Sequence, residues 1–303
     1  MEALEQGNTR DPLSRQASPP TDRVVAVVEL LATTREPSSV AAIASRLHLN
    51  RSTVTAILES LDRVGWVQRR QDRKYTLGAG LVSVVEAVRV SVPLLDGAEQ
   101  LMQDLARRTG CGAALILVGS TQVTFVNIAR GGGGIPAGVE VGVHLPLAAP
   151  MGATVVANRD EDEQRAWLAT GPESERPAFE GLLSEVRRQG GAVFGLGDTA
   201  PQILSVLSDM VDLLTEHPTQ APLRRKVLDL LMGLGGRAYT KAELAVADPL
   251  PVSYVSVPVF DNRGRAQYEL QVGPLRTGVS KAERELYLRE IQHTASELGA
   301  LRP

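Results

Sequence analysis

Two short stretches of the sequence carry residue types that bind nucleic acid. Residues 50–56 read Asn-Arg-Ser-Thr-Val-Thr-Ala, which places an amide, a guanidinium and hydroxyl groups close together. Residues 68–74 read Gln-Arg-Arg-Gln-Asp-Arg-Lys and hold four cations against one anion. Cationic groups bind phosphates, and arginine, amide and hydroxyl groups also reach base edges. The chemistry indicated is contact with the backbone and bases of DNA.

Residues 21–78 have the pattern of three short helices that would position the first stretch. Apolar residues at helical spacing predict helices near 24–31, over 40–47, and from Asn50 or Ser52 to about Val64. A three-residue turn at 48–50 separates the second helix from the third. The third helix would bury Val54, Ile57, Leu58 and Leu61. Its small polar groups would then face a DNA groove from the N-terminal end, as in a recognition helix.

The second stretch is the loop of a predicted hairpin. Residues 66–67 and 75–77 predict its two strands, and Gly65 ends the helix before it. A hairpin after such helices is the wing of a winged helix-turn-helix. The residues predicted to contact DNA are Ser39, Arg46, Asn50, Arg51, Ser52, Thr53, Thr55, Ala56, Arg69, Arg70, Arg73 and Lys74.

The charge distribution supports this prediction. Residues 21–80 hold nine arginines and lysines against six acidic residues, although the whole chain has a net charge of −3. A basic module on an acidic remainder is typical of a DNA-binding domain joined to another domain. The alternative is a small helical bundle with a solvated hairpin that does not bind DNA.

The remainder of the chain predicts an α+β domain with an antiparallel sheet. We expect a disordered tail over 1–20, a linker helix over 79–92 and a second domain over 93–303. The predicted helices are 94–109, 151–169, 173–189, 200–236 and 280–300, the last with a capping box of Ser280 and Glu283. The predicted strands are 113–118, 122–129, 139–143, 252–260 and 266–272.

The composition argues against several other classes of protein. Cys111 is the single cysteine, so no intramolecular disulfide or cysteine-cluster metal site can form. The four histidines lack metal-ligand spacing, and no catalytic triad or paired carboxylates emerge. Neither a signal peptide nor a membrane span is evident. We therefore expect a cytoplasmic protein, associated with the nucleoid when it is bound to DNA, that is not an enzyme and needs no cofactor or metal.

The sequence resembles the IclR-type bacterial transcription regulators. Ala42-Ile43-Ala44 through Ser52-Thr53 and the Tyr-Thr-Leu-Gly at 75–78 resemble that family's DNA-binding domain over about 65 residues, counted with the linker helix. The likeness is looser beyond it, at 105–110, 144–149, 187–193 and 258–265. It implies a GAF-like effector-binding domain and a homodimer or dimer of dimers (a homotetramer) on a palindromic operator. About 50 extra residues before Pro251 predict a helical insertion at about 196–250.

The resemblance also implies a pocket for a small organic effector. The positions that match it are Met151, Gly152, Ala153, Gly195, Tyr254, Tyr268, Leu270 and Val272. Leu270 and Val272 are apolar where the family tends to have small polar groups, and a buried carboxylate without donors is costly. We therefore expect a larger, more apolar or aromatic effector, or none, instead of a small acid such as glyoxylate.

These observations predict a sequence-specific regulator whose affinity for its operator is modulated by the effector. Repression is favoured over activation. The alternative is a ligand-binding or protein-interaction module that no longer uses its DNA-binding domain, and salt-dependent binding to DNA would distinguish the two.

Overall fold

The computed structural model describes residues 19–34, 36–91, 94–131, 141–196 and 235–301. These residues form two compact units, which divide between Val85 and Glu86. The first helix begins at Pro19, inside the segment predicted as a tail, and the rest of that segment lies outside the described residues. Proline suits the first turn of a helix because its missing N–H would have no partner there.

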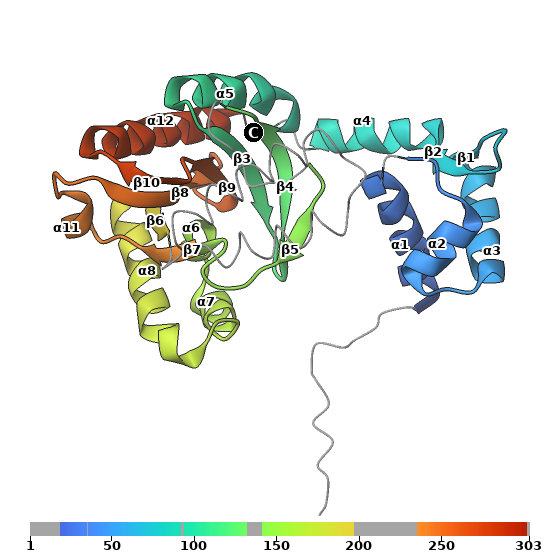
Figure 1. Ribbon diagram of the computed structural model, residues 1–303, viewed down its shortest axis with the longest axis horizontal. Coiled ribbons are helices and arrows are strands. Elements are labelled where there is room, and N and C mark those ends of the chain that lie inside the picture. The colour runs from blue at the N-terminus through green and yellow to red at the C-terminus, as the bar shows by residue number, and fades with distance from the viewer. Residues whose placement is uncertain (1–18, 35, 92–93, 132–140, 197–234, 302–303) are drawn as a thin grey trace, which may run out of the picture. The chain divides into compact units, whose positions relative to one another are not determined.

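The first unit is a helix-turn-helix followed by a small hairpin (Figure 1). Its elements are α1 Pro19–Thr34, α2 Val40–Leu47, α3 Arg51–Arg63, β1 Val67–Arg69 and β2 Tyr75–Leu77. Val27 and Ile43 from the first two helices pack on Val54 and Leu58 of α3 in a buried core. The predicted winged helix-turn-helix fold is therefore confirmed.

The turn between α2 and α3 depends on a residue in the left-handed conformation. His48 ends α2 with φ +52°, and the N–H of Leu49 donates to the carbonyl of Ala44 at 2.9 Å. A non-glycine residue rarely adopts this conformation except at such a helix end. The turn redirects the chain so that Asn50 precedes α3 as its N-cap residue.

The hairpin packs closely on the residues that follow it. The N–H of Gly78 donates to the carbonyl of Trp66 at 2.8 Å, and a Cβ at Gly78 would lie 2.3 Å from the carbonyl oxygen of Gly65. Only glycine fits so close to another backbone. A short 3-10 helix, η1 Ala79–Leu81, and α4 Val82–Ser91 then form the predicted linker helix.

The second unit is an antiparallel sheet with helices on both faces, which confirms the predicted α+β class. The strand order is β5-β4-β3-β9-β8-β6-β7, and β10 also pairs with β8. The strands are β3 Gly112–Val118, β4 Gln122–Ala129, β5 His144–Pro146, β6 Ala192–Leu196, β7 Gly235–Ala238, β8 Leu250–Phe260, β9 Ala266–Gly273 and β10 Arg276–Val279. The helices are α5 Leu94–Thr109, α6 Ala153–Val156, α7 Glu161–Leu168, η2 Glu173–Glu175, α8 Arg176–Gln189, α11 Lys241–Leu244 and α12 Lys281–Ala300.

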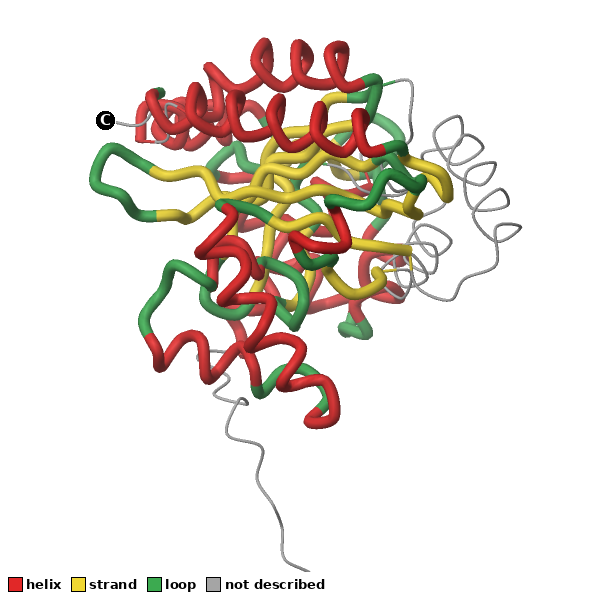
Figure 2. The backbone as a smooth tube through the Cα atoms, turned by 90° about the vertical axis from the view of Figure 1, so that its left-hand side faces the viewer, coloured by secondary structure: helices red, strands yellow, loops and turns green. Residues whose placement is uncertain are grey.

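Each face of the sheet has its own core. Figure 2 shows α5 and α12 side by side over one face, where Leu105, Leu115, Leu270 and Ile291 are buried together. The helices α6, α7 and α8 cover the other face, where side chains such as Ile116 are buried. A sheet buried on both faces leaves room for function only where polar groups or grooves interrupt these cores.

Two predicted elements of the second unit are wrong in detail, and three strands were missed. Residues 141–143 are not a strand, and the strand that pairs with β4 lies at 144–146 instead. The predicted helix over 151–169 is broken, because Asp160 caps a new helix by accepting a hydrogen bond from Glu163 N–H at 2.9 Å. The strands β6, β7 and β10 were not predicted.

The predicted helical insertion lies mostly outside the described residues. Its described part, 235–250, contains the strand β7 and the short helix α11. Leu196 at the end of β6 and Gly235 at the start of β7 are register partners in the sheet. The chain therefore leaves and re-enters the sheet at neighbouring positions, next to an irregularity in the β6–β7 register between Phe194 and Leu196.

Candidate functional site

The exposed end of α3 presents the cation and hydroxyl predicted to read DNA. Arg51 and Ser52 are exposed, whereas Val54 and Leu58 fix the opposite side of the helix in the core. Asn50 occupies the capping position but makes no side-chain capping bond, so its amide stays available. Thr53 and Thr55 are half-buried and Ala56 is exposed, which keeps this surface small enough for close approach to a groove.

The helix before it contributes two of the predicted contacts. Ser39 caps α2, and its hydroxyl accepts a hydrogen bond from Ala42 N–H at 3.2 Å. The Ser39 hydroxyl therefore keeps its own proton to donate. Arg46 is exposed in the last turn of α2. Both can reach a phosphate only if α2 lies across the backbone, as the first helix of the motif does in DNA complexes.

The wing displays all four of its predicted cations. The side chains of Arg69, Arg70, Arg73 and Lys74 are exposed. The tip is a tight turn, in which Arg70 N–H donates to the Lys74 carbonyl at 2.8 Å and Arg73 has φ +58°. Asp72 lies 3.8 Å from the Arg70 guanidinium, so one cation is partly compensated in the free protein.

A buried tyrosine fixes the wing to the helices. Tyr75 exchanges two backbone hydrogen bonds with Ser38, at 2.9 and 3.0 Å, just before α2. The guanidinium of Arg69 lies 6.0 Å from the centre of the Tyr75 ring. These contacts hold the wing and the start of α2 together, so the predicted DNA contacts of the first unit share one rigid frame.

In the second unit the structure does not bring the predicted pocket residues together. Tyr268, Leu270 and Val272 are buried under α5 and α12. Met151, Ala153 and Tyr254 belong to the core on the opposite face, beside Gly152. Gly195 lies against Tyr239, whose hydroxyl would be 3.0 Å from a Cβ there. These positions therefore do not form one pocket.

The error came from the register of one strand. The family resemblance placed Leu270 and Val272 in the pocket, but successive strand residues point to opposite faces. The residues of β9 that face α6 are the alternate ones, including Glu269 and Gln271. The apolar character of Leu270 and Val272 belongs to the core and gives no information on an effector.

A buried polar cluster occupies the α6 face of β8 and β9. Glu269 is 2% exposed, and its carboxylate accepts hydrogen bonds from the hydroxyl and N–H of Thr154 and from the amide of Gln271, the last at 2.6 Å. Burial raises the pKa of the Glu269 carboxyl, and these donors offset only part of that shift. The sequence showed an alternating strand here but gave no sign that its polar face is buried.

The neighbouring strand adds two further polar groups. Ser256 lies opposite Gln271 and is 1% exposed, and its hydroxyl has no hydrogen-bond partner among the described residues. Tyr254, two residues away, stacks on Phe194 with ring centres 4.4 Å apart. A buried hydroxyl without a partner is uncommon and calls for an explanation, such as a bound ligand or water.

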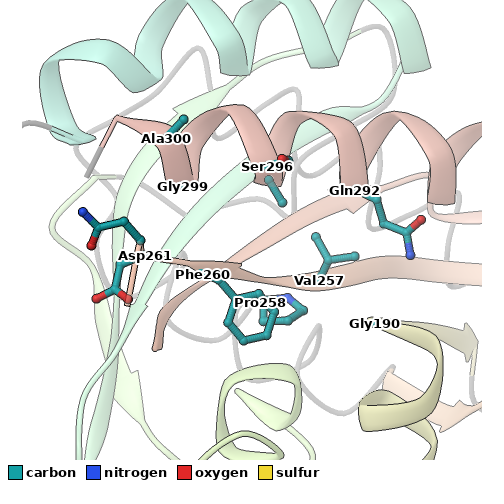
Figure 3. Close-up of a pocket in the computed structure, with 11 residues that line it drawn as sticks. Gly190, Val257, Pro258, Phe260, Asp261, Gln292, Ser296, Gly299 and Ala300 are labelled. Atoms are coloured by element: carbon teal, nitrogen blue, oxygen red, sulfur yellow. The ribbon is translucent and has the colours of Figure 1, made fainter. Parts of the chain in front are cut away.

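Grooves open on both sides of the sheet. One of about 450 Å³ lies between α12 and the end of β8, where Gln292 and Ser296 face Val257 (Figure 3). Another of about 450 Å³ lies between α8 and the β6–β7 edge, with Phe179 and Phe194 in its wall. The second groove lies on the face of the polar cluster, because Phe194 in its wall stacks on Tyr254.

The other candidate groups have structural explanations. Cys111 is buried beside Thr109 and Tyr287, and burial raises the pKa of its thiol. Within the described residues no three histidine, cysteine or acidic side chains could hold a metal ion. Nor does any described helix have the length and apolarity to cross a membrane.

The pKa shift of Glu269 predicts a pH-dependent stability. Its pKa is raised from an ordinary value of 4.5, so above that pH the folded state keeps a proton that the unfolded chain has lost. The free energy of unfolding therefore falls as the pH rises from this ordinary value towards the raised pKa of the folded state. Tyr254, the titratable neighbour, has its pKa raised by burial and by Glu269 and stays neutral there. Glu269→Gln removes the ionisation.

We therefore expect this variant to gain stability over the wild type as pH rises from 5 to 8, measured by urea unfolding at each pH. Glu285→Gln, at an exposed position on α12, is the matched control and should show no such trend. A constant difference between Glu269→Gln and the wild type across this range would contradict the buried, proton-retaining carboxyl.

Comparison with known proteins agrees with this architecture. The family model of the IclR helix-turn-helix domain matches residues 20–71. No curated protein matches the sequence. An IclR transcriptional regulator structure from Alicyclobacillus acidocaldarius is 20% identical with a TM-score of 0.64, over 94% of this chain and 99% of that one.

Two further structures have the same two-domain fold. The Thermotoga maritima IclR is 17% identical with a TM-score of 0.56, over 92% of this chain and 96% of that one. An IclR homologue from Microbacterium hydrocarbonoxydans, complexed with 4-hydroxybenzoate, is 18% identical with a TM-score of 0.63, over 92% of this chain and 97% of that one. At these identities the likeness shows the fold.

Proposed function

We propose that this chain, an IclR-type transcription regulator by its helix-turn-helix domain, binds a palindromic operator as a homodimer or dimer of dimers. Its α3 lies in the major groove, and the cations of the wing contact the backbone or the minor groove. The observation that carries this proposal is the exposure of Arg51 and Ser52 in the first turn of α3. Ser39, Arg46, Asn50, Thr53, Thr55 and Ala56 complete the surface on the helices.

Arg51→Ala should weaken binding to the operator by about 1–3 kcal/mol, because Arg51 offers two donors to a guanine or a phosphate. A pull-down of genomic DNA with the purified protein supplies the operator, and a gel-shift assay at fixed salt measures the affinity. Arg63→Ala is the matched control, because Arg63 is exposed at the opposite end of the same helix. Equal affinity of Arg51→Ala and the wild type would contradict the placement of α3.

The pull-down also tests the function itself. Salt-dependent enrichment of particular promoter fragments supports a regulator. Recovery of no specific fragment would favour a ligand-binding or protein-interaction module with a vestigial DNA-binding domain. Repression is our proposal for the effect on transcription, and a promoter-reporter fusion in the presence and absence of the protein measures it.

An apolar stripe on α4 supports a homodimer. Val84, Val85 and Val88 share one side of the helix and are 41–48% exposed, which is unusual for three valines in one turn and a half. A second copy of this stripe would cover them symmetrically, as two-fold assembly on a palindrome requires.

Replacing Val85 and Val88 with glutamate should therefore shift the protein to monomer, because it buries charges in the contact. Sedimentation equilibrium measures the change. Ser83→Glu, on the opposite side of α4, is the control that should leave the oligomer intact. A doubly substituted protein that stays dimeric would show that the contact lies elsewhere.

We further propose that the second unit binds a small organic effector that lowers operator affinity. Two observations support this: the fold is similar to that of the homologue complexed with 4-hydroxybenzoate, and the α6 face holds a polar cluster beside an aromatic groove. The predicted residues that remain candidates are Met151, Ala153 and Tyr254, with Phe194 and Ser256 added. Release of DNA in the gel shift on addition of a candidate effector tests the coupling.

A further inference from the structure

We propose that the effector of this chain presents a neutral or cationic hydrogen-bonding group, and no carboxylate, to the cluster of Glu269, Gln271, Ser256 and Tyr254. The inference rests on the proposed effector site and names the chemical class of its ligand. It also replaces the expectation drawn from Leu270 and Val272, because those side chains lie on the other face.

The cluster lies inside an otherwise apolar layer. On the same face Ala114 and Ile116 of β3 lie opposite Gln271 and Glu269, and Val155 of α6 is fully buried nearby. Polar side chains are retained in such a layer only when they are satisfied by partners. Glu269 has three donors from the protein, but the Ser256 hydroxyl has no partner among the described residues. The Ser256 hydroxyl is therefore the group of this cluster that can still hydrogen-bond to a ligand.

The charge of the cluster decides what that group can be. Glu269 receives only neutral donors, from Thr154 and Gln271, and no cation in the described part of the chain acts on it. Two carboxyl groups that share a buried site cannot both ionise without a large cost. An acid directed at Glu269 would therefore lack a free cation among the residues described, because Arg237 in the groove is already paired with Glu243, whereas an amide, alcohol or amine could donate to Glu269 and Ser256 directly.

The groove beside the cluster indicates the other end of the ligand. Phe179, Leu182 and Phe194 form the apolar part of its wall, whereas Glu185 and Arg237 lie at its charged part. The Phe194 ring stacks on Tyr254 of the cluster with ring centres 4.4 Å apart. Aromatic walls favour an apolar or aromatic body. The ligand class is thus an apolar body with an uncharged or positively charged donor at one end.

Three probes that share one ring and differ in charge test this directly. They are 4-hydroxybenzoate, 4-hydroxybenzamide and 4-hydroxybenzylamine, titrated calorimetrically into the full-length protein at pH 7.5. We expect the amide or the amine to bind at least about tenfold more tightly than the acid. Glu269→Gln should narrow this difference at least about tenfold, because it removes the ionisable carboxyl and keeps the shape. Glu285→Gln, exposed on α12, should leave the order unchanged.

Tighter binding of the acid than of the amide and the amine would overturn the inference. So would binding of none of the three, or an order that Glu269→Gln leaves unchanged. The proposed function is tested separately, because these titrations contain no DNA. If the protein binds the amide but enriches no promoter fragment, the proposed ligand class stands and the proposed regulatory function fails.

Discussion

Replacing Arg69, Arg70, Arg73 and Lys74 together with alanine is expected to weaken operator binding on the order of 100-fold near physiological salt. Each phosphate contact contributes about 0.9 to the slope of log affinity against log salt, so the slope should fall by about 3. This decrease in slope is smaller than that expected from four complete phosphate contacts, because Arg70 is partly paired with Asp72 and Arg69 lies over Tyr75.

The salt slope separates a wing that binds phosphates from one that only shapes the fold. The anchors of the wing, Val67 and Tyr75, are buried and unchanged in this variant, so the helices should keep their structure by circular dichroism. A matched control removes four exposed cations from the second unit, Arg107, Arg165, Lys281 and Arg289, and gives the same net charge. If both variants lose affinity equally, the wing has no special role.

Asp72 offers a complementary test within the same turn. Its carboxylate accepts a hydrogen bond from Lys74 N–H at 3.2 Å and lies 3.8 Å from the Arg70 guanidinium. Asp72→Asn therefore keeps the shape of the turn and leaves the Arg70 guanidinium without its ion pair. Affinity should rise by a few-fold at low salt and the gain should fade as salt rises, because salt screens exposed charges. The same gel-shift series measures it.

The first unit could be predicted from the sequence because its signals are local. The spacing of Val54, Leu58 and Leu61 gives the buried side of α3 directly, and the loop composition gives the cationic tip of the wing. The buried side of α1 is harder to predict from the sequence, because Val25 is 49% exposed whereas Val27 is fully buried. A helix rich in valine on several sides does not show which side its partners will cover.

The second unit could be predicted only in outline. Its strands β3, β4, β8 and β9 follow from runs of β-branched residues, but their faces depend on partners far away in the sequence. Leu270 and Glu269 are neighbours that face opposite sides of the sheet, so an error of one residue in register reverses the chemistry expected on a face. The strand β6 follows directly on a glycine pair and is only five residues long, which is too short to give a periodic signal.

Arg284 is the clearest case of a residue whose role only the tertiary structure shows. A charged residue in the first turns of a helix is ordinarily exposed, yet Arg284 is 1% exposed. Its guanidinium donates to the carbonyls of Val279 at 2.7 Å and of Val246 at 2.6 Å, and also to those of Leu244 and Asp248. It therefore ties the loop after α11 to the start of α12.

Arg284→Ala should lower the free energy of unfolding of the second unit by about 3–5 kcal/mol, because it leaves four carbonyls without a donor and opens a cavity. Urea unfolding followed by the buried Trp167, in a Trp66→Phe background, reports this unit alone. Arg284→Lys keeps the charge but not the planar fork of donors, so its loss should be intermediate. Arg289→Ala, exposed on the same helix, should change stability by less than about 0.5 kcal/mol. If Arg284→Ala loses as little stability as Arg289→Ala, the hydrogen bonds of Arg284 do not hold the loop after α11 in place.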